Sequence, residues 1–181
     1  GPEEPLTTLG LTQWLLGVVV PLALVVLILV ADQLEGPKTA YVGVLAVVPM
    51  FHANARGLPY TAPMVGTKLV FPGPKMGDAA TLVALMNEEG VTMAAGVPTV
   101  WTLLLNYLDQ SGVKLKTLKR TLVGGSAVPL SMIRDFEQKH GVLVLQGWGM
   151  TETSPIGTVG TLRAGMDSLP ADERHRIQAL Q

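Results

Sequence analysis

The stretch GWGMTETSP, from Gly147 to Pro155, combines residue types that together could bind a nucleotide. Trp148 offers a flat aromatic surface on which a base can stack, and the hydroxyl group of Thr151 can bond a phosphate. The carboxylate of Glu152 can hold a magnesium ion, and the two glycines let a ligand approach the backbone closely. We therefore predict a turn that faces a nucleotide. The structural alternative is that Trp148 caps the hydrophobic core and Glu152 is a solvated helix cap.

Three further turns contain residues that could face a ligand. VGGSAVP, residues 123–129, places two glycines and a small serine where a flat ligand could reach the backbone, although the glycines could simply form the bend. His52 in PMFHANARG is followed by small residues that leave room for a pocket; the alternative is a histidine bonded near a helix start. Trp101 in GVPTVW, residues 96–101, could bound an apolar cavity or could be an ordinary core tryptophan.

Short apolar runs alternate with segments of helical spacing, which predicts the elements that hold these turns. We expect five strands, at residues 41–49, 67–71, 91–96, 120–124 and 142–147. We expect three helices, from Asp78 to Gly90, from Pro98 to Gly112 and from Pro129 to Gly141. Strands that alternate with helices imply right-handed crossovers, so we predict an α/β fold with a parallel sheet and helices on both faces. Ligands bind such sheets at the carboxyl ends of the strands, where all four turns are expected.

Composition and charge exclude several classes of function. A length of 181 residues suffices for one domain with its own core. The formal net charge of -1 provides no basic field, so nucleic acid is not expected as a main partner. The absence of cysteine excludes a disulfide framework, a thiolate zinc site and a cysteine nucleophile. It also fits a reducing compartment, so we expect the protein in the cytoplasm. The three histidines are too scattered to predict a metal cluster.

The first forty residues differ in composition from the rest of the chain. The apolar run 14–31 carries no charge and approaches the roughly 20 residues of a membrane-spanning helix. The run would then associate the chain with a membrane; the alternative is a buried hairpin or core helix, because Pro21 interrupts it. Charged residues, a glycine and a proline end the run at residues 32–40. We therefore divide the chain into an apolar N-terminal segment, residues 1–40, and a folded domain, residues 41–181.

Taken in order, four motifs resemble the adenylate-forming superfamily, and specifically the medium- and long-chain fatty acyl-CoA synthetases. The motifs are PMFHANARGLPYTAPMVGTKLVFPGP, AAGVPTVW, LKRTLVGGSAVP and GWGMTETSPIGTVGTL, at spacings similar to those of the family. The resemblance extends from Val42 to the C-terminus, and we do not expect the first forty residues to share it. It implies a partial AMP-binding, or adenylation, domain: part of the large N-terminal domain of such an enzyme. These enzymes activate a carboxylic acid with ATP and Mg2+ as an acyl-adenylate and transfer the acyl group to coenzyme A.

The resemblance also implies a role for each residue that matches a motif. Trp148 would stack on adenine, Thr151 would bond the α-phosphate, and Glu152 would hold the magnesium ion. His52 would border the acyl carboxylate and the thioester channel. The catalytic residues would be His52, Thr151 and Glu152. The other residues expected to bind the nucleotide are Gly125, Ser126, Ala127, Gly147, Gly149 and Met150, and those expected to line the acyl pocket with His52 are Val97, Pro98 and Trp101.

Two parts of the family's pattern have no match in this sequence. The phosphate-gripping loop, rich in Ser, Thr and Gly and ending in Pro-Lys-Gly, should precede PMFHANA, where this chain is apolar. The ribose-binding aspartate, the hinge and the C-terminal domain with its lysine should follow the position of Gln181. We therefore expect a fragment of a fatty acyl-CoA ligase that is inactive alone. The alternatives are a membrane-anchored, non-catalytic protein that binds a nucleotide or a partner, and a misassembled gene product without function.

Overall fold

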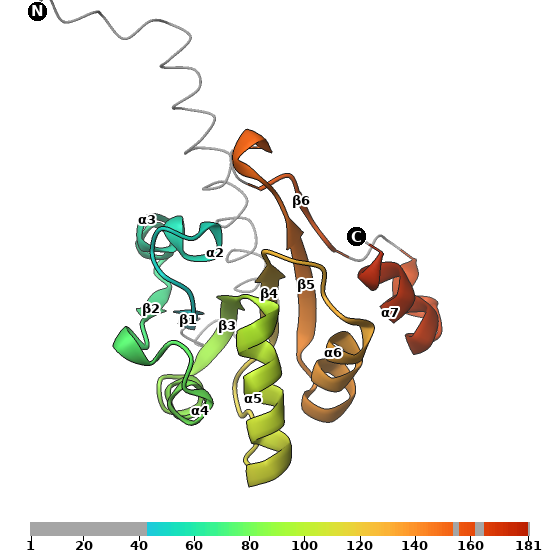
Figure 1. The fold of residues 1–181 in the computed structure, drawn as a ribbon, viewed down its shortest axis with the longest axis horizontal. Coiled ribbons are helices and arrows are strands. Elements are labelled where there is room, and N and C mark those ends of the chain that lie inside the picture. Colours follow the sequence, from blue (N-terminus) through green and yellow to red (C-terminus); the bar gives the residue numbers. More distant parts are fainter. Residues whose placement is uncertain (1–42, 154–155, 162–164, 181) are drawn as a thin grey trace, which may run out of the picture.

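A six-stranded sheet forms the centre of the structure, a computed structural model that describes residues 43–153, 156–161 and 165–180 (Figure 1). The strands are β1 (Gly43–Ala46), β2 (Lys68–Val70), β3 (Val91–Gly96), β4 (Arg120–Gly124), β5 (Leu143–Trp148) and β6 (Thr158–Val159). Their order across the sheet is β2-β1-β3-β4-β5-β6. The five strands expected from the apolar runs are present at the expected places, and β6 is an additional strand that the sequence patterns do not predict.

The prediction of a fully parallel sheet is wrong at one edge. β1 to β5 pair in parallel, whereas β6 is antiparallel to β5, with Gly147 opposite Val159 and Trp148 opposite Thr158. The connection between β5 and β6 is short and contains the turn Thr151–Thr153, and a short connection permits only an antiparallel neighbour. The sheet is therefore mixed. Because β6 has only two residues, it is too short to show an alternating pattern in the sequence.

The structure gives no support to the predicted membrane-spanning segment. Within residues 43–153, 156–161 and 165–180, no helix is long and apolar enough to cross a bilayer. The apolar run 14–31, on which the membrane helix was predicted, lies outside the described residues. Hydropathy alone does not separate a membrane helix from the apolar chain of a folded domain, because both consist of residues that avoid water.

Helices cover both faces of the sheet, as the alternating pattern predicts (Figure 1). The connection from β1 outward to β2 carries α2 (Ala53–Arg56) and α3 (Leu58–Met64) on one face. The connections that return through β3, β4 and β5 carry α4 (Ala79–Glu88), α5 (Pro98–Ser111) and α6 (Leu130–Arg134) on the other face. Right-handed crossovers require this division, because the chain moves in opposite directions across the sheet. The direction changes between β1 and β3, and open α/β sheets bind ligands at such a point.

The helix boundaries follow most of the expected start and stop residues. The Asp78 side chain begins α4 by accepting a hydrogen bond from the backbone N–H of Thr81 at 3.2 Å. Pro98 begins α5, and Gly112 ends it with φ at 69°, a conformation that favours glycine. The third helix is less regular than expected, because α6 continues as a short π-helical segment, Asp135–Lys139.

Two apolar clusters hold the layers together, one on each face of the sheet. The cluster under α4, α5 and α6 includes Trp101, which is fully buried and meets the Phe136 ring edge-on at a centroid distance of 6.0 Å. A later helix, α7 (Ala171–Ala179), packs against this cluster through its last residue. The cluster under α2 and α3 includes Met93. Successive side chains of β1 alternate between the two clusters, as the pleat of a strand that is buried on both faces requires.

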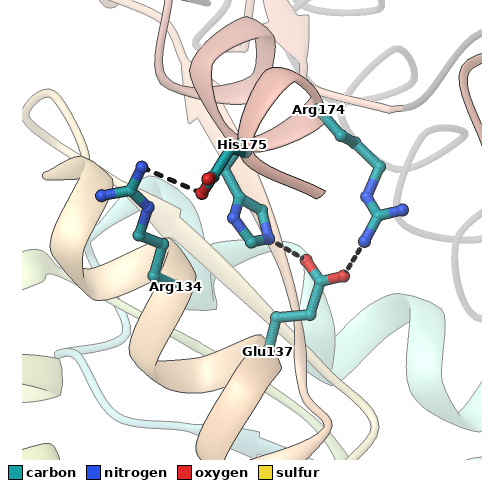
Figure 2. A network of polar contacts seen from close by, with 5 residues as sticks. Arg134, Glu137, Arg174 and His175 are labelled. Carbon is teal, nitrogen blue, oxygen red and sulfur yellow. Dashed lines mark hydrogen bonds and ion pairs between the residues drawn. The ribbon is translucent and has the colours of Figure 1, made fainter. Parts of the chain in front are cut away.

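A network of charged side chains attaches α7 to the helical segment that ends at residue 139 (Figure 2). The Glu137 carboxylate contacts the Arg174 guanidinium and accepts a hydrogen bond from Nε2 of His175 at 2.7 Å. The His175 side chain is fully buried, so its Nε2 relies on this carboxylate for a partner. A second pair joins Arg134 to Asp172 at 3.0 Å in a more exposed position. Charge pairs therefore hold α7 in place in addition to apolar contact.

Glu137→Ala should destabilise the protein, because it removes the partner of both Arg174 and the buried His175. We expect the free energy of unfolding to fall by about 1–3 kcal/mol, the usual cost of an unsatisfied buried polar group. Asp172→Ala is the matched control, since it breaks an ion pair whose carboxylate is 70% exposed and should cost less than about 1 kcal/mol. Urea unfolding followed by circular dichroism measures both losses. Equal losses in the two variants would contradict the importance of the buried bond.

His140 should make the protein less stable in mild acid. Burial, together with the positive charge of Lys114, holds the pKa of His140 below its ordinary value of 6.5. The stability that the neutral ring contributes is present above that ordinary value and is lost as the pH falls through the lowered pKa. His140→Gln should therefore lose less stability than the parent as the pH falls below 6.5, and the two should differ little above that pH. Urea unfolding at each pH tests this, and identical pH profiles for parent and variant would show the expectation to be wrong.

Candidate functional site

The turns predicted to face a ligand lie along one edge of the sheet. β1, β3, β4 and β5 are parallel neighbours in that order, so their carboxyl ends point the same way (Figure 1). The residues that follow these strands are 47–52, Val97, 125–129 and 149–150. Four turns that are far apart in the sequence therefore form one row, and the row includes the point where the chain changes direction across the sheet.

His52, Val97 and Gly125 bring three of these turns together. A Cβ atom placed on Gly125 would lie 3.4 Å from Cγ1 of Val97 and 3.7 Å from Nε2 of His52. Gly125 has φ at +96°, which residues with a side chain rarely adopt. The turn after β4 therefore presents bare backbone between a valine and an imidazole.

The imidazole of His52 caps α2 with one nitrogen and faces the turn after β4 with the other. Its Nδ1 accepts a hydrogen bond from the backbone N–H of Asn54 at 3.2 Å. An accepting Nδ1 places the proton of the neutral ring on Nε2, the nitrogen that faces Gly125. The structural alternative for this histidine, a bond near a helix start, is therefore present, and the same bond directs an N–H donor toward the turn.

The turn VGGSAVP has exposed residues in its middle and a buried, hydrogen-bonded residue after them. Gly125, Ser126 and Ala127 are exposed, whereas Val128 is buried. The backbone N–H of Val128 donates to Oε1 of Gln146, a buried residue on β5, at 3.2 Å. This bond ties the turn to the neighbouring strand, so the exposed backbone keeps a defined place.

Trp148 lies at the end of β5 with 51% of its surface exposed, so it does not cap the core. Its ring covers Gly157, where a Cβ atom would come within 2.6 Å of Cζ3. The backbone N–H of Gly157 donates to the carbonyl oxygen of Trp148 at 2.9 Å and helps to close the turn between β5 and β6. A half-exposed indole that is supported in this way is a surface on which a base can stack.

The other described side chains of GWGMTETSP lie at or near the surface. Gly149, Met150 and Glu152 are exposed, and Glu152 forms no ion pair with another described residue. Thr151 begins a short 3-10 turn, and its side chain is not among those that the structure describes. The Thr153 hydroxyl accepts from the backbone N–H of Met150 and donates to its carbonyl oxygen, both at 2.9 Å, which shapes the turn.

The residues predicted to line the acyl pocket separate into two groups. Val97 and Pro98 are partly exposed at the start of α5, in the row of turns. Trp101 is fully buried, and a Cβ atom placed on Gly96 would lie 3.0 Å from its Cζ2 atom. Trp101 is thus a core tryptophan that supports the turn from behind.

The sequence patterns did not single out two buried amides next to the turns, Asn54 and Gln146. Each is 8% exposed. The Nδ2 atom of Asn54 donates to the carbonyl oxygen of Gly96 at 2.7 Å, and Gln146 accepts from Val128. The sequence does mark both amides, because Gln146 ends the apolar run VLVLQ and Asn54 stands between two alanines. A polar residue in such a place is usually hydrogen-bonded if it is buried.

Magnesium fits this edge only together with a nucleotide. In the described part of the chain, no group of three or more histidine, aspartate or glutamate residues could hold a metal ion. Glu152 offers one exposed carboxylate. Because Mg2+ in nucleotide sites is held by one or two carboxylates and by the phosphates of the substrate, Glu152 matches the protein's share of such a site.

A known family of enzymes matches most of this sequence. The domain model of the AMP-binding enzymes matches residues 22–178, and the chain therefore belongs to that family. The match confirms the resemblance to adenylate-forming enzymes. It begins inside the apolar run 14–31, so the family's domain takes in part of the run that hydropathy had suggested as a membrane helix.

The curated relatives are fatty-acid CoA ligases and enzymes related to them. Over 136 residues, the chain is 52% identical to a long-chain-fatty-acid–CoA ligase from Thermus thermophilus, and the match covers 75% of this chain and 25% of that protein. Over 138 residues, it is 51% identical to a medium-chain-fatty-acid–CoA ligase from Ectopseudomonas oleovorans, with 76% and 25% covered. The chain thus spans about a quarter of the length of these relatives.

Solved structures share the fold at lower identity. A long-chain-fatty-acid–CoA ligase from Archaeoglobus fulgidus matches with a TM-score of 0.60 at 23% identity, over 77% of this chain and 29% of that one. The o-succinylbenzoate coenzyme A synthetase from Bacillus subtilis, solved in complex with ATP and a magnesium ion, matches with a TM-score of 0.61 at 21% identity, over 82% and 30%. These likenesses show that the chain shares the fold of part of each of these two proteins.

Proposed function

We propose that this chain carries part of the active site of an ATP-dependent acid–thiol ligase that converts a fatty acid to its CoA thioester. The observation that carries the proposal is the meeting of His52, Val97 and Gly125 at the ligand-binding edge, in the same row of turns as Trp148. In the first step a carboxylate oxygen of the acid attacks the α-phosphorus of ATP, and pyrophosphate leaves. In the second step the thiol of coenzyme A attacks the acyl carbonyl carbon, and AMP leaves.

The turns after β4 and β5 suit the nucleotide. Adenine would stack on the exposed indole of Trp148 and contact the exposed backbone of residues 125–127. The hydroxyl of Thr151 would bond the α-phosphate. The carboxylate of Glu152 would hold a magnesium ion that offsets the charge on the departing pyrophosphate. Each of these groups is polar or aromatic because it meets a ligand rather than the core.

The turns after β1 and β3 suit the acid. The Nε2–H of His52 would donate to an oxygen of the acyl carboxylate, since Nδ1 is occupied by the backbone of α2. Val97 and Pro98 would border the apolar chain of the acid, and Trp101 would keep that wall rigid from behind. The two relatives above 50% identity are named for long- and medium-chain fatty acids, which supports this class of substrate.

Trp148→Ala should weaken ATP binding by the purified chain. Loss of a stacking surface costs about 1–3 kcal/mol per base, and it should not alter the dependence of binding on magnesium. Leu103→Ala on α5 is the matched control, because Leu103 is 52% exposed and lies outside the row of turns. Isothermal titration calorimetry with ATP and Mg2+ measures the affinities. An unchanged affinity in Trp148→Ala, or no ATP binding by the parent, would overturn the proposed nucleotide site.

Glu152→Gln should lower the affinity for ATP most strongly when magnesium is scarce. Glutamine keeps the size of the side chain but lacks the charge that the metal requires, so raising the Mg2+ concentration should recover part of the affinity. The control is Glu88→Gln, which removes an exposed carboxylate from α4. If Glu152→Gln behaves as the parent does at every Mg2+ concentration, Glu152 is only a solvated residue.

We expect the chain alone to form no CoA thioester from a fatty acid, ATP and coenzyme A. An assay of thioester formation in the same samples tests this expectation.

A further inference from the structure

We propose that Asn54 is a positioning residue that sets the placement of His52 relative to the nucleotide-facing turn after β4. The inference rests on the proposed function, because it treats this edge as the site of ATP and the acid. Asn54 itself is 8% exposed, so its role is exerted through its neighbours rather than through contact with a ligand. No motif assigned a role to this residue.

Two hydrogen bonds connect Asn54 to two of the turns. Its backbone N–H donates to Nδ1 of His52 at 3.2 Å and thereby orients the imidazole. Its side-chain Nδ2 donates to the carbonyl oxygen of Gly96 at 2.7 Å, at the carboxyl end of β3. One residue thus links the histidine to the strand end that leads into Val97.

The Asn54 amide also packs against the end of β4. A Cβ atom placed on Gly124 would lie 3.1 Å from Oδ1 and 3.2 Å from Nδ2 of Asn54, and 3.0 Å from the carbonyl oxygen of Gly147. These distances are tighter than most real Cβ contacts, so the amide occupies space that only glycine leaves open. Asn54 therefore fixes the distance from α2 to β4, the strand that leads into Gly125.

The local chain is not sufficient to hold His52 in place. α2 has only four residues, and so short a helix has little stability of its own. The orientation of its first turn must therefore come from tertiary contacts. The bond from Asn54 to Gly96 is buried, so loss of the amide donor would leave the Gly96 carbonyl oxygen without this partner and would favour a shift of α2 that admits water to it.

The test replaces Asn54 with leucine, which has a similar size and no hydrogen-bond donor. We expect the Cε1–H NMR signal of His52 to shift or broaden in the absence of ligand, with the signal assigned from His52→Gln. We also expect the dissociation constant for ATP with Mg2+ to rise about tenfold, the consequence of a modest displacement of the turn. If Asn54→Leu does not fold, Asn54→Asp takes its place, because it keeps the size and cannot donate to Gly96.

Thr117→Val is the matched control. The Thr117 hydroxyl donates to the carbonyl oxygen of Val91 at 2.8 Å, so it anchors the amino end of the same strand, β3, far from the row of turns. This variant should lose stability in urea while the His52 signal and the ATP affinity stay as in the parent. The proposal is overturned if the asparagine variant leaves the His52 signal unchanged, or if the two variants change that signal equally at equal loss of stability.

The two readouts also separate this proposal from the proposed function. The His52 signal is measured without a ligand and reports on Asn54 whether or not ATP binds. A parent chain that does not bind ATP would refute the nucleotide site, whereas an unmoved His52 signal in Asn54→Leu would refute the positioning role.

Discussion

The close approach of three chain segments at the ligand edge depends on the missing side chain of Gly124. A Cβ atom there would meet the Asn54 amide and the carbonyl oxygen of Gly147 at 3.0–3.2 Å. The carbonyl oxygen belongs to the paired backbone of β5 and cannot move without disturbing the ladder. Any larger residue would therefore push α2 away from the sheet. The close approach of His52 to the turn after β4 follows from this one constraint on volume.

The reversal of chain direction between β1 and β3 explains which residues meet. His52 arrives on the outward connection, whose helices cover one face, while Val97 and Gly125 belong to the returning connections, whose helices cover the other face. Turns from opposite faces come together only at a strand edge where the direction changes. The site thus combines groups that no single helix or hairpin could present. This arrangement suits a reaction in which a nucleotide and an acid must be held side by side.

The turn that carries the exposed Trp148, Met150 and Glu152 gains its order from the elements on either side of it. Before the turn, β5 lies within the parallel sheet, and after it β6 pairs back along β5. Further along the chain, α7 is attached through the Glu137 carboxylate to Arg174 and the buried His175 (Figure 2). A surface turn can thus carry polar residues while the strands on either side of it are held by backbone pairing.

The amino-acid sequence by itself determined the features that rest on local backbone preference and on short motifs. The runs of β1 to β5 were predictable from apolar residues between turn signals, and Asp78, Pro98 and Gly112 marked helix ends because capping acts over a few residues. The four turns and the family were predictable for the same reason, since each motif is contiguous. Only the tertiary structure decided the antiparallel pairing of β6, the burial of Trp101, and the bonds from Asn54 to Gly96 and from Gln146 to Val128. The two hydrogen bonds join residues that are distant in the chain. The pairing of β6 and the burial of Trp101 depend on sheet register and on which helix covers which face, neither of which a local pattern encodes.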